Sequence, residues 1–118
     1  ALPEQVPHRE AVFNVSHACL VTAAFLCGDL QALKIGMHDR LHQPYRSPLI
    51  PGFDHVLEAA AGTGALGTCL SGAGPTLLAF ATEGAERVKE AMVDAWRTEG
   101  IEADAHISKI DPDGVTRE

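Results

Sequence analysis

The chain has 118 residues, 46% of them apolar, which suits one compact domain with a hydrophobic core. A net charge of -7 argues against a nucleic-acid-binding surface, because neutralising phosphates requires clustered Lys and Arg. The same acidity offers an anionic substrate no general attraction, so any phosphate or carboxylate site must be local.

The start of the chain and its cysteines bear on localisation. The sequence opens with Ala1 and lacks a basic leader, so we expect no signal peptide and either a trimmed chain or a piece of a longer protein. The longest strongly apolar stretch, residues 18–27, is too short to cross a bilayer. Three cysteines without a CxxC motif predict buried free thiols: Cys19, Cys27 and Cys69. These features predict a cytoplasmic protein that binds neither membrane nor nucleic acid.

Helices dominate the first half of the chain. Apolar residues occupy nearly every face of residues 9–27, which predicts a helix buried on most sides. Gly28 suits a left-handed C-cap, and Asp29 suits the N-cap of a second helix that should run to about His42. Three prolines in residues 43–52 predict an ordered loop.

Helices and strands alternate in the second half. A third helix is expected from Phe53 to Gly62, and a fourth from about Gly84 to Glu99. Short apolar runs at residues 65–70 and 76–81 predict two strands, and the alternation at 101–108 predicts a half-buried third. The last four residues are expected to fray. We predict a single α+β domain over residues 1–118, ferredoxin-like, with helices covering an antiparallel sheet.

The sharpest local motif is the loop SGAGPT, residues 71–76. Glycine permits backbone conformations closed to other residues, and successive N–H groups in such a turn can bind an anion. The hydroxyls of Ser71 and Thr76 lie at the two ends of the loop. A hairpin turn that needs glycine for its geometry alone explains the same composition.

Arg46 lies in a loop stiffened by prolines, which would pre-organise its guanidinium for a carboxylate or phosphate. A solvated arginine or a surface ion pair is the alternative. His38 and His42 have the i, i+4 spacing of a metal pair, but no third ligand is evident, so we assign no metal. Asn14 and Ser16 interrupt the apolar first helix and could either satisfy a helix end or face a ligand.

Several of these segments, taken in order, resemble the carboxyl-terminal half of homoserine kinases, which belong to the GHMP class of small-molecule kinases. The resemblance covers residues 2 to about 115. The loop SGAGPT is typical of the whole class, whereas HQPYR followed by LIPG indicates homoserine kinases in particular. The matching segments are 2–7, 11–14, 39–46, 49–52, 64–67 and 71–76.

The resemblance implies a reaction and a set of site residues. Homoserine kinases transfer the γ-phosphoryl of ATP to the side-chain hydroxyl of L-homoserine, with Mg²⁺, in threonine biosynthesis. By resemblance, Arg46 contacts the substrate, plausibly its carboxylate, and Gly72 makes a backbone contact to it. Ser71, Ala73 and Gly74 have a supporting place around the phosphates. The catalytic base is not assigned.

The family's phosphate-binding motif, PxxxGLGSS, is absent from the chain. We therefore expect ATP and Mg²⁺ to be bound mainly by a missing amino-terminal domain, and these residues alone to be inactive. Loss of that domain should leave apolar surface exposed, with a tendency to self-associate that includes a homodimer.

Two other interpretations stay open at the sequence level. One is a non-catalytic α+β domain that binds a small ligand or regulates a partner through the same loop. The other is a protein–protein module whose apolar first helix docks onto a partner. A PxxxGLGSS segment upstream would favour the kinase over both.

Overall fold

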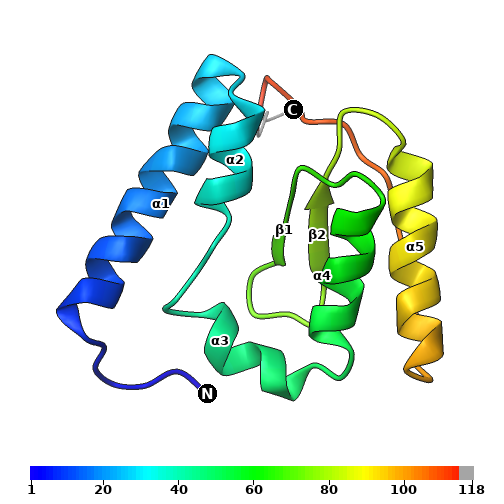
Figure 1. Ribbon diagram of the computed structural model, residues 1–118, viewed down its shortest axis with the longest axis horizontal. Helices are drawn as coiled ribbons and strands as arrows, with labels where there is room; N and C mark the ends of the chain where they lie inside the picture. Colours follow the sequence, from blue (N-terminus) through cyan, green and yellow to red (C-terminus); the bar gives the residue numbers. More distant parts are fainter. Residues whose placement is uncertain (115–118) are drawn as a thin grey trace, which may run out of the picture.

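The computed structural model describes residues 1–114, and within that range it confirms an α+β fold (Figure 1). The last four residues, which were predicted to fray, lie outside the described part. The elements in chain order are α1 His8–Cys27, α2 Leu30–Gly36, α3 Gln43–Arg46, the 3-10 helix η1 Ser47–Leu49, α4 Phe53–Gly62, β1 Gly67–Leu70, β2 Leu77–Phe80 and α5 Ala85–Thr98.

The two strands form an antiparallel hairpin, as predicted. Gly67 pairs with Phe80 and Leu70 with Leu77, so the glycine loop is the turn that joins them. Helix α4 packs against both strands, and α5 packs against α4 (Figure 1). Ile50, Phe53 and Leu70 form the buried cluster at the loop end of the hairpin. The core thus supports the strand end from which the glycine loop leaves.

Helices α1 and α2 form a second packed pair, joined by the predicted caps. Gly28 has φ 69°, and its N–H donates to the carbonyl of Ala24. The carboxylate of Asp29 accepts the N–H groups of the first turn of α2, Gln31 and Ala32. A Cβ on Gly36 would lie 2.8 Å from Val21 Cγ2, so glycine allows α2 to approach α1 closely.

The prediction that the first helix is buried on most faces is wrong for the described residues. Ala24 is its one buried residue. The apolar stretch at 18–27 is too short to cross a membrane, but the whole of α1 is long and apolar enough to do so. This is weak evidence for a membrane span, because core helices of soluble proteins pass the same test of length and composition. The elements that pack on α1 in this chain cover one side of it, so its apolar outer face remains in solvent.

The cysteine prediction is corrected in the same way. Cys19 and Cys27 are exposed because they lie on the uncovered side and at the end of α1. Cys69, in β1, is half-buried, and burial raises the pKa of its thiol.

The second helix is shorter than predicted. It ends at Gly36, and residues 37–42 form a turn and bends before α3 begins at Gln43. The expected loop at 43–52 contains two short helical elements, with Pro44 in the first turn of α3 and Pro48 in that of η1. Proline is tolerated there because the N–H it lacks has no partner within the helix.

The strand predicted at residues 101–108 is not formed, and most of that segment is exposed. In the described part of the chain, the sheet has two strands, β1 and β2. An alternating sequence becomes a strand only where a neighbouring strand supplies hydrogen bonds, and no described strand pairs with this segment.

Candidate functional site

The glycine loop is a tight turn closed by its own main chain. Ser71 N donates to the carbonyl of Thr76 at 2.9 Å, and Gly74 N donates to the carbonyl of Ser71 at 3.1 Å. Ser71, Gly72 and Ala73 are exposed at its tip. The hydrogen bonds among residues 1–114 do not use the N–H of Gly72 or Ala73. Two adjacent amides are therefore available to bind an anion or a polar ligand.

The two glycines of the loop have different roles. Gly72 has φ 56°, and a Cβ built on it would meet no atom within 4 Å. Gly74 has φ 83°, and its Cβ would lie 2.9 Å from Leu70 Cδ1 and 3.0 Å from Ile50 Cδ1. Gly74 therefore fits the loop against the core, whereas Gly72 leaves backbone open to solvent.

Arg46 reaches this loop from α3. Its Nη1 donates to the carbonyl of Ala73 at 3.0 Å, which joins two segments 27 residues apart. Its Nε is buried and has no hydrogen-bond partner among residues 1–114. A buried donor without a partner is costly, so the guanidinium is incompletely satisfied by the part of the chain described here.

Gln43, at the start of α3, attaches the same helix to the sheet. Its Oε1 accepts the N–H of Leu70, the last residue of β1, at 2.7 Å. Sequence reasoning did not single out this residue. Its place in the HQPYR segment could have marked it as a candidate. Its bond to Leu70, 27 residues away in the sequence, could not be predicted without the fold.

Asp39 organises the amino end of α3. Its carboxylate accepts the N–H groups of Leu41 at 3.3 Å, His42 at 2.8 Å and Gln43 at 2.5 Å. It also accepts a hydrogen bond from Asn14 Nδ2 in α1. Partial burial raises the pKa of Asp39, but the bonds from Asn14 and the three amides together outweigh it, so this pKa lies below its ordinary value.

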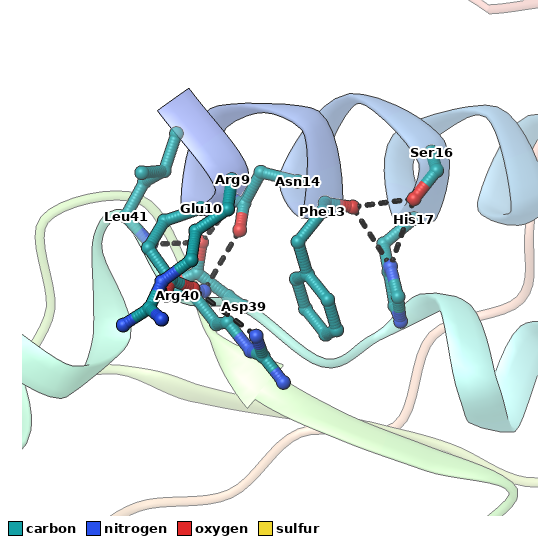
Figure 2. A network of polar contacts seen from close by, with 9 residues as sticks. All are labelled: Arg9, Glu10, Phe13, Asn14, Ser16, His17, Asp39, Arg40 and Leu41. Atoms are coloured by element: carbon teal, nitrogen blue, oxygen red, sulfur yellow. Dashed lines mark hydrogen bonds and ion pairs between the residues drawn. The ribbon is translucent and has the colours of Figure 1, made fainter. Parts of the chain in front are cut away.

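Helix α1 holds Asp39 and Arg40 at several points, as Figure 2 shows. Asn14 Oδ1 accepts the N–H of Arg40 at 2.8 Å. The guanidinium of Arg40 lies 3.7 Å above the Phe13 ring, and its Nη1 donates to Glu10 at 3.1 Å. The sequence left open whether Asn14 satisfies a helix end or faces a ligand. In the structure its side chain bonds to residues 39 and 40 of the same chain.

The two histidines with metal-pair spacing do not share a helix. Helix α2 ends before His38, and His42 is the residue that precedes α3. Within residues 1–114, no group of three or more His, Cys, Asp or Glu side chains is placed to hold a metal ion. A cleft of about 380 Å³ lies between α2, α3, α4 and β1. Asp39 and Gln43 line it, whereas Arg46 and residues 71–76 do not.

The geometry brings together Arg46 and four loop residues: Ser71, Gly72, Ala73 and Gly74. Arg46 contacts Ala73 directly, and Gly72 lies beside that contact with a free N–H. A guanidinium next to free backbone amides can bind a carboxylate or a phosphate.

Comparison with known proteins points in one direction. The sequence profile of the family described as GHMP kinases C terminal matches residues 20–98. The homoserine kinase of Halothermothrix orenii is 48% identical over 80% of this chain and 30% of its own length. That of Synechocystis sp. is 43% identical over 98% of this chain and 38% of its own length.

A solved structure agrees. The homoserine kinase of Cytophaga hutchinsonii, 34% identical, superposes on 92% of this chain and 35% of its own with a TM-score of 0.87. The chain thus spans about a third of the length of the relatives it matches. It belongs to the GHMP kinase C-terminal family and is similar to the carboxyl-terminal part of homoserine kinases.

Proposed function

We propose that these 118 residues are one domain of a longer cytoplasmic enzyme that transfers the γ-phosphoryl of ATP to the side-chain hydroxyl of L-homoserine, in threonine biosynthesis. The domain supplies Arg46 and the glycine loop to the homoserine site. The observation that carries the proposal is the bond from Arg46 to Ala73, because it joins the HQPYR segment, which indicates homoserine kinases in particular, to the glycine loop, which is typical of the GHMP class.

Arg46 binds the homoserine carboxylate in this proposal. One N–H of Nη1 is already used on Ala73, which fixes the side chain, and the remaining N–H groups of Nη1 and Nη2 can pair with a carboxylate in a fork. The free N–H of Gly72 makes the backbone contact to the substrate, and Ser71, Ala73 and Gly74 support the phosphates. Phosphoryl transfer depends largely on such positioning.

ATP and Mg²⁺ are bound mainly by the amino-terminal part of the longer protein. Mg²⁺ in kinases is usually held by one or two carboxylates together with the substrate phosphates. Mg²⁺ would supply charge neutralisation to the transferring phosphoryl group. What the described residues can contribute is a cation and backbone donors for the amino-acid substrate.

The outer face of α1 packs against the amino-terminal part of the same chain. Three large apolar side chains on this face are exposed: Val12, Val15 and Leu26. The relatives are about three times as long as this chain, so a body of protein large enough to cover this face exists in them. Apolar surface of this extent usually marks a contact with other protein.

Cys19 is a built-in probe of that contact, because it is exposed on α1. We expect it to react at least about tenfold more slowly with a thiol reagent in the longer protein than in the 118-residue chain. Peptide mapping by mass spectrometry would follow each cysteine. Equal reactivity in both proteins would refute the contact, and protection of the 118-residue chain that depends on its concentration would favour a second copy.

Arg46→Ala in the longer protein tests the substrate assignment. The KM for homoserine should rise about 10- to 100-fold, the loss expected for hydrogen bonds to a charged group, while the KM for ATP changes little. Arg87→Ala is the matched control, since Arg87 also donates to a main-chain carbonyl, that of Thr63. Unchanged homoserine kinetics in Arg46→Ala would contradict the assignment.

The 118-residue chain alone should not turn over. A coupled assay should detect no homoserine-dependent release of ADP from it. Turnover at a rate comparable with that of the longer protein would overturn this part of the proposal.

A further inference from the structure

We propose that Asn14 and Asp39 are positioning residues that hold Arg46 in register with the glycine loop. The inference rests on the proposed role of Arg46 and adds to it two residues that touch neither the loop nor the guanidinium. Asn14 lies in the long helix α1, and Asp39 lies in the turn between α2 and α3. Their mutual hydrogen bond spans 25 residues of sequence.

The first step is the crowding of donors on Asp39. One carboxylate accepts four hydrogen bonds, three from main-chain amides and one from a side chain. The amides of residues 41–43 have no carbonyl four residues earlier within a helix, so Asp39 supplies their acceptor. The direction in which the chain enters α3 therefore depends on this carboxylate.

The second step leads from Asp39 to Arg46. Helix α3 has four residues, far below the length at which a helix is stable by itself. Besides the bond from Arg46 itself to Ala73, its orientation depends on two attachments: Asp39 at the entry and Gln43 on β1. Arg46 is the last residue of α3, one turn beyond the amide of Gln43 that Asp39 holds, so a tilt at the entry moves the guanidinium.

The third step is the anchor in α1. The side-chain amide of Asn14 donates through Nδ2 to Asp39 and accepts through Oδ1 from the N–H of Arg40. It thus holds two consecutive residues at once, as the labelled side chains in Figure 2 show. A side chain that both donates and accepts is required, which explains an asparagine at this position in a largely apolar helix.

Asp29 provides a matched comparison within the chain. It caps α2 with the same chemistry, a carboxylate that accepts two amides of the first helical turn. Helix α2 carries no residue of the proposed homoserine site. Asp29→Asn therefore makes the same substitution at another helix N-cap without touching the support of Arg46, and because both amides bond to Oδ1, the asparagine can still accept them.

The test measures steady-state kinetics of the longer protein with homoserine and ATP varied separately. Asp39→Asn should raise the homoserine KM by roughly tenfold, because its amide group presents a donor to other donors, and should leave the ATP KM nearly unchanged. Asn14→Asp should act similarly, because it faces two carboxylates against each other. Asp29→Asn should leave both KM values within about twofold.

The exchanged pair, Asn14→Asp with Asp39→Asn, gives the sharpest readout. Asp at 14 can accept from Arg40 N and from the new amide at 39, whose oxygen can still accept from His42 and Gln43. The homoserine KM should return to within about threefold of the wild type, although the bond to Leu41 is lost. Failure of the exchange to improve on either single variant would overturn the proposal.

A background lacking Arg46 separates this inference from the proposed function. In Arg46→Ala, adding Asp39→Asn should raise the homoserine KM no further, because nothing remains to be positioned. An equal further rise in that background would show that Asp39 acts by another route and would overturn the inference. If Arg46→Ala raises the homoserine KM but Asp39→Asn does not, the inference alone fails. If Arg46→Ala has no effect, the proposed function of Arg46 fails first.

Discussion

Helices α1 and α5 turn opposite kinds of surface to the solvent. Helix α5 buries Val88 and Ala95, and its outer face carries two ion pairs at i, i+3 spacing, Glu86 with Lys89 and Asp94 with Arg97. Helix α1 is longer, buries Ala24, and leaves Val12, Val15 and Leu26 exposed to water. The outer face of α5 is charged and suited to contact with water, whereas the outer face of α1 has the apolar composition of a surface that contacts other protein.

The largest effect should come from placing a charge on each outer face of the longer protein. Val15→Lys, at a site 65% exposed in this chain, should lower the free energy of unfolding by about 2–5 kcal/mol, because the charge would be buried without a partner. Glu90→Lys on the exposed face of α5 should change it by less than about 0.5 kcal/mol. Urea unfolding would measure both, and equal small effects would erase the difference between the two helices.

A second experiment applies one substitution to both regions of the 118-residue chain. Val56 in α4 is fully buried, so Val56→Ala should cost about 2 kcal/mol of unfolding free energy. Val15→Ala removes the same methyl groups from a solvent-facing site and should cost less than about 0.5 kcal/mol. A comparable loss at the two sites would mean that α1 is already covered in the isolated chain.

The smallest effect concerns the link between α1 and the rest of the molecule. Because the pKa of Asp39 is lowered by folding, its carboxylate stabilises the fold above its unfolded pKa of about 3.9, and this contribution is lost as pH falls through the folded pKa. The difference in unfolding free energy between wild type and Asp39→Asn should thus be constant above about pH 5 and shrink below about pH 4. Urea titrations from pH 6 to 3 would measure it, and a difference independent of pH would contradict the assigned hydrogen bonds.

Local signals in the sequence predicted much of the fold. The cap pair Gly28 and Asp29, the helix at Phe53–Gly62 and the two strands around the glycine loop depend on neighbours in sequence, and the structure confirms them. The helix expected to reach His42 failed because long-range bonds from Asn14 fix residues 39 and 40 outside a helix. The burial of Cys19 and Cys27 was mispredicted because the apolar composition of a helix does not reveal whether the surface that would cover it belongs to these 118 residues.

The site was predicted in part. Arg46 and the glycine loop were singled out from residue chemistry, their specific roles came from the resemblance to a family, and those roles remain a proposal. Their contact through Ala73 could not be read from spacing, because the two segments are 27 residues apart. Gln43 and Asp39 were missed for the same reason: their partners, Leu70 and Asn14, are distant in the sequence.

The most direct measurement of the central claim pairs Arg46 with the charge it is proposed to bind. The ratio of kcat/KM for L-homoserine to that for L-homoserine amide, which lacks the carboxylate charge, would be compared in the wild-type longer protein, Arg46→Ala and Arg87→Ala. We expect a preference for homoserine of about 10- to 100-fold in the wild type and Arg87→Ala, and a ratio near one in Arg46→Ala. A preference that survives intact in Arg46→Ala would contradict the account.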